Sequence, residues 1–273
     1  MLKHRVLFAS LIAVLSLLAA AVSISAHEEG EIPTFPIEST EDGISLPPEL
    51  PAGLVTLSFE NGNEAPFTPI LARLNEDVTF EQFAEALNQG PETAIPLVSL
   101  LGAPQIAPEA SFDVTYNFEP GTHVLMDFES EVPVIETFTV VEGEVEQVVE
   151  SEADVTVVLV DYLFGMPVEI EAGVKHWSIE NAGEEWHEMG IFHVEEGTTV
   201  EEAVEVITAA MEQETEPEME QVFFWTPLSP GEQAQFELEL EAGTYLVICF
   251  LPSFADGSPH FAHGMAQIIT VSE

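Results

Sequence analysis

The sequence QAQFELELEAGTYLVICF, residues 233–250, has a clear strand pattern. Apolar and polar residues alternate on both sides of EAG at 241–243, which is the pattern of two strands joined at this turn. The segment PEASFDVTYNFEPGTHVLMDF (108–128) aligns with PGEQAQFELELEAGTYLVICF (230–250) at an offset of 122 residues. The same pair of strands is therefore predicted twice in the chain.

The repeat extends toward the N-terminus. Residues 52–87 and 172–207 align without gaps at an offset of 120. The chain is thus predicted to hold two copies of one domain of about 110–120 residues, a usual domain size. The predicted organisation is a signal peptide (1–26), a flexible acidic lead-in (27–44), a degenerate first domain (45–142), an acidic linker (143–152) and a second domain (153–273).

Short strands separated by glycine and asparagine turns predict an all-β fold of two tandem Greek-key β-sandwiches. One short helix is expected in each copy. In TTVEEAVEVITAAM (198–211), Thr199 and Glu202 form a capping box, and the apolar face is predicted to hold Val200, Val204, Ile207 and Met211. The first copy has Thr79, Gln82, Phe80, Ala84 and Leu87 in the matching places.

The N-terminus has the pattern of an export signal. Lys3 and Arg5 precede an apolar stretch at 6–22, and small residues follow it. This pattern is typical of a cleaved secretory signal peptide and predicts a secreted or periplasmic protein. A retained N-terminal anchor is the alternative, because the stretch is nearly long enough to span a bilayer.

The chain is strongly acidic, with 4 basic and 50 acidic residues and a net charge of −46. After the signal peptide the basic residues are Arg73 and Lys175. This charge disfavours binding to nucleic acid or to anionic membranes, and it favours a basic partner protein. A solvated acidic surface without a partner is the alternative interpretation.

Cys249 is the single cysteine of the chain. Exported proteins normally pair their cysteines, and one cysteine cannot form an internal disulfide. It is therefore a buried spectator, an intermolecular link or a metal ligand.

Three other residues accompany Cys249 in the second copy. His187 follows an Asn-x-Gly turn at the start of a predicted strand, and His260 and Met265 lie in the loop before the last strand. A thiolate, two imidazoles and a weak axial thioether are the ligands of mononuclear copper electron-transfer sites. Taken singly, Cys249 and Met265 are also explained as core residues.

The second copy resembles the cupredoxin family, which includes plastocyanin and azurin. The resemblance rests on NAGEEWH (181–187), AGTYLVIC (242–249) and HFAHGM (260–265). It implies one copper bound by His187, Cys249, His260 and Met265, and single-electron transfer. The sequence departs from the family in the ten residues between Cys249 and His260, which are more than plastocyanin-like proteins have. His263 is the reserve candidate for the second imidazole.

The first copy serves as an internal comparison. Phe67 replaces His187, and Asp127 replaces Cys249. No histidine or methionine occurs in ESEVPVIETF (129–138), which stands in place of the ligand loop. The first copy is therefore expected to bind no copper and to act as a structural or partner-binding domain.

The residues also led us to expect that the protein is not an enzyme. The sequence has no His-x-His pair of the kind that a trinuclear copper site uses, and no Gly-rich phosphate loop. Two alternatives to an electron carrier stay open. One is a periplasmic copper carrier, for which His27 would add an N-terminal ligand if cleavage follows Ala26. The other is a metal-free interaction or structural module that keeps the fold.

Overall fold

The structure is a computed structural model that describes residues 32–128, 133–143, 152–215 and 217–273. The predicted signal peptide (1–26) lies outside the described residues, and so do residues 144–151 of the predicted acidic linker. Among the residues it describes, the structure contains no helix long and apolar enough to cross a membrane.

The chain forms one series of strands and helices twice. The first copy contains β1 (Thr34–Thr40), β2 (Gly43–Ser45), β3 (Glu49–Pro51), β4 (Gly53–Asn61), β5 (Ile70–Leu74), α1 (Phe80–Gln89), α2 (Pro91–Ala94), the 3-10 turn η1 (Ile95–Leu97), β6 (Val98–Leu100), β7 (Ser111–Phe118), β8 (Gly121–Asp127) and β9 (Val134–Val141). The second contains β10 (Val155–Val160), β11 (Leu163–Gly165), β12 (Glu169–Glu171), β13 (Gly173–Asn181), β14 (His187–Val194), α3 (Val200–Gln213), β15 (Glu220–Leu228), β16 (Gln233–Leu240), β17 (Gly243–Ile248), the 3-10 turn η2 (His260–His263) and β18 (Ala266–Ser272).

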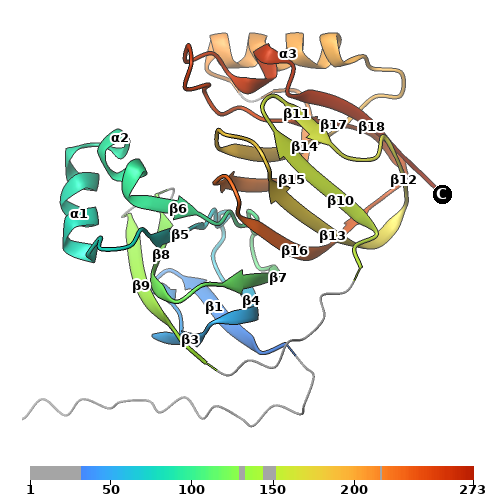
Figure 1. Ribbon diagram of the computed structural model, residues 1–273. Coiled ribbons are helices and arrows are strands. Elements are labelled where there is room, and N and C mark those ends of the chain that lie inside the picture. The colour runs from blue at the N-terminus through green and yellow to red at the C-terminus, as the bar shows by residue number, and fades with distance from the viewer. Residues whose placement is uncertain (1–31, 129–132, 144–151, 216) are drawn as a thin grey trace, which may run out of the picture.

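These strands build an all-β fold of two sandwiches, as the sequence predicts (Figure 1). One sheet has the order β11-β10-β13-β16-β7-β4-β1-β2 and runs through both copies. Each copy adds a sheet of its own, β12-β18-β17-β14-β15 in the second and β3-β9-β8-β5-β6 in the first. The alternating segment 233–250 forms β16 and β17, so its two strands lie in different sheets.

The two copies meet in both layers of the sandwich. In the shared sheet, β16 pairs with β7 in antiparallel orientation. In the other layer, isolated bridges join Leu101 to Leu228 and Pro104 to Trp225. One hydrophobic core runs across the junction, because Trp225, Phe236 and Tyr116 belong to the same buried cluster. Trp177 is 1% exposed and lies in this cluster too.

Part of the predicted lead-in (27–44) is ordered sheet, and its description as flexible is wrong there. β1 pairs in parallel with β4 from Thr34↔Thr56 to Ser39↔Asn61, and Ile37 is buried. The segment TFPIEST is polar enough to read as a tail, but every second residue is covered by the sandwich. β15 is not among the predicted strands, because its buried positions do not alternate.

Both predicted capping boxes are confirmed. The hydroxyls of Thr79 and Thr199 accept backbone N–H groups of Gln82 and Glu202, whose side chains accept the N–H of the capping residue. The apolar face of α3 differs from the prediction at its end: Met211 is 49% exposed, and Ala210 packs in its place. The short α2 is an additional helix that the sequence analysis does not predict.

Candidate metal centre

Two neighbouring strands bring the first two candidate ligands together. β14 begins at His187, and β17 ends one residue before Cys249. These strands pair from Gly190↔Ile248 to Val194↔Thr244, so continuing the register past Gly190 brings His187 toward Cys249. The backbone N–H of Glu188 lies 3.5 Å from the Cys249 sulfur and donates to it.

The third candidate, His260, returns because the long loop is closed at its base. Pro252 and Pro259 form an isolated bridge, the N–H of Ser253 donates to the Ser258 carbonyl at 2.8 Å, and the N–H of His260 donates to the Leu251 carbonyl at 2.8 Å. Gly257 supplies the left-handed conformation that the turn requires, with φ +77°. Leu251 and His260 are thus neighbours in space, and the ten intervening residues do not separate the ligands.

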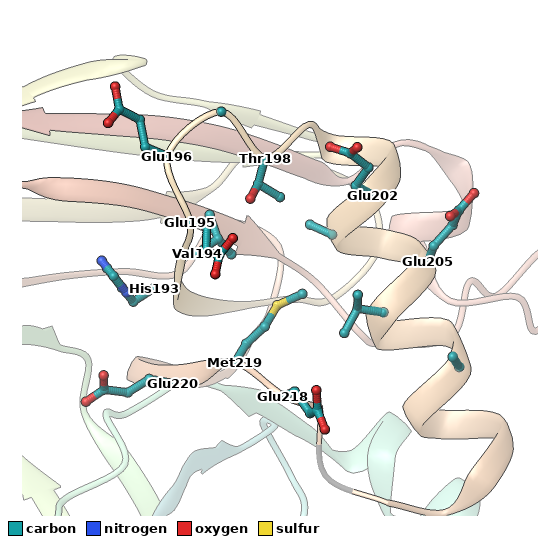
Figure 2. A pocket seen from close by; sticks show the side chains of 14 residues that line it. His193, Val194, Glu195, Glu196, Thr198, Glu202, Glu205, Glu218, Met219 and Glu220 are labelled. Carbon is teal, nitrogen blue, oxygen red and sulfur yellow. The ribbon is translucent and has the colours of Figure 1, made fainter.

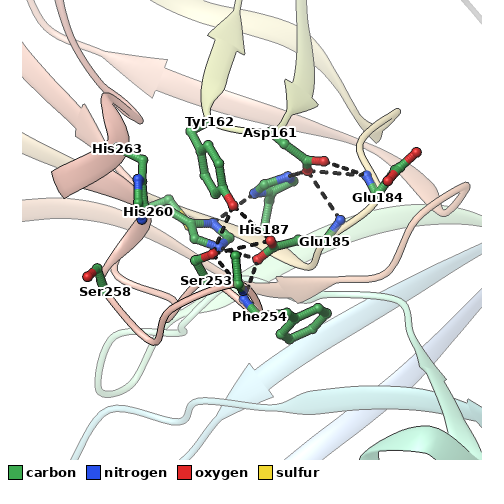
Figure 3. Close-up of polar contacts among 12 residues, drawn as sticks. Asp161, Tyr162, Glu184, Glu185, His187, Ser253, Phe254, Ser258, His260 and His263 are labelled. Atoms are coloured by element: carbon green, nitrogen blue, oxygen red, sulfur yellow. Dashed lines mark hydrogen bonds and ion pairs between the residues drawn. The ribbon is translucent and has the colours of Figure 1, made fainter.

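His187, Cys249 and His260 form a compact cluster, and Figure 3 shows the two histidines of this cluster side by side. Their ligand atoms lie within 4.8 Å of one another, and all three side chains are 0% exposed. The two Nδ1 atoms are 3.1 Å apart, and the Cys249 sulfur is 3.4 Å from Nδ1 of His260. Within the described residues, no other group of three histidine, cysteine or carboxylate side chains is close enough to hold a metal ion.

Met265 lies directly beside this cluster. It is 0% exposed, its N–H donates to the His260 carbonyl at 3.0 Å, and its carbonyl accepts the Cys249 N–H at 3.2 Å. The backbone therefore places Met265 next to two candidate ligands. Its role as a fourth ligand stays a prediction.

His263, the reserve candidate, is not part of the cluster. Its Nε2 contacts Asp256 at 3.1 Å, and its ring stacks on Tyr162 at a centroid distance of 4.7 Å. The side chain is 30% exposed. The structure therefore favours His260 over His263 as the second imidazole.

A carboxylate stands behind each histidine of the cluster, as Figure 3 shows. Nε2 of His187 lies 2.8 Å from Oδ1 of Asp161, and Nε2 of His260 lies 3.1 Å from Oε2 of Glu185. Gly183 makes the first contact possible. A Cβ at this position would stand 2.5 Å from Asp161 Oδ1 and 2.8 Å from His187 Nε2.

Glu185 also joins the loop 250–259 to the rest of the site. The N–H of Phe254 donates to it at 2.8 Å, and the hydroxyls of Tyr162 and Ser253 donate at 2.8 and 3.3 Å. The Tyr162 ring meets the His260 ring edge-on at a centroid distance of 5.0 Å. The long loop is thus held over His260 by one carboxylate.

The carboxylates determine which nitrogen of each ring carries the proton. Burial raises the pKa of both Asp161 and Glu185, but hydrogen bonds from backbone amides and the histidine contacts outweigh it, and both pKa values are lowered. An ionised carboxylate only accepts hydrogen bonds, so Nε2 of each neutral ring must donate. In neutral rings of this tautomer the two Nδ1 atoms, 3.1 Å apart, face each other with unshared electron pairs, and a cation held between them would relieve their repulsion.

The thiol stands in an environment that keeps it protonated when no cation is bound. Burial, with the negative charge of Glu188 as the next cause, raises the pKa of Cys249 to about 12. Glu188 is itself buried, which raises its pKa to about 7. Binding of a thiophilic metal at this position therefore displaces a proton. The donor set of one thiolate and two imidazoles fits copper.

The first copy keeps the same backbone without the candidate ligands. Asn61 donates to the carbonyls of Ala65 and Ile106, as Asn181 does to those of Glu185 and Leu228, which are their equivalents in the repeat. Phe67, in the place of His187, is buried core. Asp127, in the place of Cys249, is buried as well. The turn between β4 and β5 therefore keeps these hydrogen bonds without any of the site's side chains.

The sequence analysis did not identify Asp161, Glu185, Tyr162 or Ser253. Acidic residues are so frequent in this chain that no single pair stood out. The repeat did carry a signal, because Glu185 aligns with Ala65, two residues before the position where His187 aligns with Phe67. Only the copy that contains the candidate ligands therefore has a carboxylate at this position.

A separate hollow lies beside α3 (Figure 2). Its polar lining consists mainly of His193 and the glutamates Glu195, Glu196, Glu202, Glu205, Glu218 and Glu220. The hollow is open and strongly acidic. It contributes no residue to the cluster of His187, Cys249 and His260.

Comparisons with known proteins find similarity only among solved structures. No protein-family model matches the sequence, and no curated protein matches it. Auracyanin B is 20% identical over 46% of this chain and 94% of its own, with a TM-score of 0.32. A multicopper oxidase is 15% identical over 88% of each chain, with a TM-score of 0.25. The copper-containing nitrite reductase of Thermus scotoductus is 11% identical over 88% of this chain and 61% of its own, with a TM-score of 0.25.

These neighbours correct one expectation. The prediction that the protein is not an enzyme is contradicted, because an oxidase and a reductase are among the structures to which the chain is similar. The lack of His-x-His pairs speaks only against one kind of catalytic copper site, and it does not exclude enzymes as a class. The similarity is one of fold, and at these identities it assigns no activity. The chain is thus similar in fold to copper proteins with tandem cupredoxin-like domains and to a single-domain blue copper protein.

Proposed function

We propose that the protein is an exported copper protein that exchanges single electrons through one mononuclear centre in its second domain. The observation that carries the proposal is the convergence of the Cys249 sulfur and the Nδ1 atoms of His187 and His260 in a buried cluster. A copper ion held there would supply one-electron exchange between Cu(I) and Cu(II). His187, Cys249 and His260 would hold it, with Met265 as the fourth candidate.

The surroundings support a redox role more than metal capture alone. The ligands are buried and are fixed from behind by hydrogen bonds, so their positions are set before metal binding. A preorganised site limits the rearrangement that accompanies electron exchange. Exposed acidic groups lie near the site: Figure 3 shows Asp161 and Glu184 beside His187, and Asp256 contacts His263 at 3.1 Å. A basic redox partner is the class of protein that this surface would attract.

The test is a titration of the purified, metal-free protein with Cu(II), followed by visible and EPR spectroscopy. One copper per chain with an intense thiolate-to-Cu(II) band is expected, and Cys249→Ser should abolish that band. His263→Gln is the matched control, because His263 lies next to the cluster but outside it, and this variant should keep the band. Voltammetry should then give a reversible one-electron wave without release of copper.

Two results would contradict the proposal. Copper binding of equal strength in the wild type and in Cys249→Ser would place the metal elsewhere. Absence of stoichiometric binding in the wild type would leave a fold without a metal function. Tight binding with copper released on reduction would instead indicate a copper carrier.

A further inference from the structure

We propose that Asp161 and Glu185 are positioning residues that hold His187 and His260 as Nε2–H tautomers and, through their charge, make the site favour Cu(II) over Cu(I). This inference rests on the proposed function. It also makes a statement about the metal-free protein, namely which ring nitrogens are protonated, and that statement stands without copper.

The two carboxylates make the same kind of contact, each with Nε2 of a different histidine. Asp161 follows β10 and meets Nε2 of His187, while Glu185 precedes β14 and meets Nε2 of His260. Each leaves Nδ1 of its histidine directed toward the other ring. A carboxylate behind a ligating histidine fixes the ring's tautomer and orientation and raises its basicity as a ligand.

The carboxylates are themselves fixed. Backbone N–H groups of Glu184 and Glu185 donate to Asp161 at 3.1–3.2 Å. Glu185 accepts from the Phe254 N–H and from Tyr162, each at 2.8 Å. Neither carboxylate therefore depends on the histidine contact for its position. This arrangement allows them to orient the rings rather than to follow them.

Two positions, Gly183 and Ala65, show that these contacts are specific to the site. Gly183 leaves the space in which Asp161 and His187 meet, and any Cβ would enter it. In the first copy the equivalent of Glu185 is Ala65, and the loop keeps the same asparagine hydrogen bonds. Glu185 is therefore not needed to fold the turn between β13 and β14, and its presence accompanies the candidate ligands.

The negative charges of Asp161 and Glu185 have a second effect, on the charge of the cation that the site prefers. With the Cys249 thiolate, the two carboxylates place three negative charges around the metal position. Each favours the more highly charged cation, because the interaction energy grows with the product of the charges. Removing either charge should therefore weaken Cu(II) binding more than Cu(I) binding.

The experiment measures Cu(II) and Cu(I) affinities by competition with chelators in the full chain. Glu185→Gln keeps an oxygen acceptor but loses the charge, and Glu185→Ala loses both. Asp161→Asn tests the other carboxylate, and Gly183→Ala forces the Asp161–His187 contact apart. Cu(II) affinity is expected to fall about 10-fold in the two amide variants and up to about 100-fold in Glu185→Ala and Gly183→Ala. The Cu(II)-to-Cu(I) affinity ratio should fall in both amide variants.

Two kinds of control separate positioning from structural damage. Asp256→Asn removes the charge from a similar carboxylate–imidazole contact, at 3.1 Å on His263 outside the cluster, and should leave both affinities unchanged. The double variant Tyr162→Phe/Ser253→Ala removes the hydroxyls that bind Glu185 and leaves the His260 contact. If this variant loses as much Cu(II) affinity as Glu185→Ala, Glu185 acts only by holding the loop, and the proposal is wrong.

Histidine ¹⁵N spectra of the metal-free protein test the tautomers directly. His187 and His260 should both show a protonated Nε2 and an unprotonated Nδ1 in the wild type, and His260 should lose this preference in Glu185→Ala. A protonated Nδ1 on either ring in the wild type would overturn the inference. If the tautomers are as expected but no copper binds, the proposed function fails and the positioning role stands.

Discussion

Val114 of β7 pairs with Phe236 of β16, and Phe236 is the residue that the 122-residue offset of the repeat assigns to Val114. The neighbouring pairs, Gln235 with Thr115 and Ala234 with Tyr116, continue outward from this point in antiparallel register. A local two-fold axis therefore passes through the Val114–Phe236 pair. The two copies meet as the subunits of a symmetric dimer do, with the same surface used on both sides.

The second layer of the sandwich follows the same symmetry. The N–H of Gln105 donates to the Phe224 carbonyl at 2.8 Å, and Thr226 and Ala103 exchange N–H···O bonds around it. The segment after β6 thus pairs with its equivalent in β15. The junction is built from paired backbone in both layers, so it should be rigid.

Gly102 is the position where this junction is most sensitive to a side chain. It has φ +64°, and a Cβ would overlap Nε1 of Trp225 and stand 3.0 Å from the Thr226 carbonyl. Gly102→Ala should lower the free energy of unfolding by about 3 kcal/mol or more, since it adds overpacking to the cost of a left-handed backbone. Gly231→Ala is the control: its φ is +83° with open space around it, and it should cost about 1–2 kcal/mol. Equal costs in urea denaturation would contradict the packing argument.

Arg73 ties the two copies together by charge. It pairs with Glu119 in its own copy and, at 3.2 Å, with Glu232 of the other, which also accepts from Ser99 at 2.8 Å. The Arg73 side chain is 22% exposed, so Arg73→Met should cost about 1–3 kcal/mol by leaving Glu232 without its cation. Lys175→Met removes a pair with exposed Glu171 and should cost less than about 0.5 kcal/mol. The two variants are compared by thermal and urea unfolding at the same ionic strength.

His123 should make the stability of the protein depend on pH. Its ring is buried between Phe118 and Phe138, and burial lowers its pKa to about 4 from an ordinary value of 6.5. The unfolded chain therefore binds a proton that the folded chain does not, between these two pH values. The contribution of His123 to the free energy of unfolding is fully present above pH 6.5. It is lost as the pH falls toward 4, and the loss amounts to about 3 kcal/mol.

The variant His123→Phe should not show this loss of stability at low pH, whereas the contributions of other titratable groups should stay the same. The difference in unfolding free energy between wild type and variant is measured at pH 7.5 and pH 4.5. It should change by about 2–3 kcal/mol in favour of the variant at the lower pH. His193→Gln, at an exposed histidine, is the control and should show no such change.

Cys249 should be unreactive in the metal-free folded protein. The side chain is 0% exposed and its pKa is raised to about 12, so very little thiolate exists at pH 8. Its reaction with an aromatic disulfide reagent should be slower than that of a free cysteine by a factor on the order of 10³. Unfolding in guanidinium should restore the ordinary rate. A fast reaction in the native state would mean that the loop over the site opens easily.

Much of the fold follows from the sequence because the two copies can be read against each other. The offsets of 120 and 122 residues place β4 over β13 and β8 over β17, and the alternation at 233–250 gives two strands correctly. β15 is not predicted, because its buried residues do not alternate along the strand. This burial pattern reflects its place at the junction between the copies. Pairing between copies is a long-range contact, and no local pattern encodes it.

The residues of the candidate site also fall into two groups, those that the sequence predicts and those that it does not. His187, Cys249 and His260 were predicted because their residue types are rare in this chain and match one chemistry. Asp161 and Glu185 were not, because they are two among 50 acidic residues. Their importance lies in which nitrogen they face, and this follows from the turn after β10 and the loop 250–259 rather than from composition.

The bridge between Pro252 and Pro259 has a consequence for how the chain can vary. Everything that the ligands need is fixed at the base of the loop, by Leu251, His260 and the Glu185 contacts to Ser253 and Phe254. Ala255 and Asp256 at the tip contact neither His187 nor His260, so an insertion between these two residues should be tolerated without moving either imidazole. A search that requires a fixed interval between cysteine and histidine would overlook proteins built in this way, whereas one that looks for the closing residues would find them.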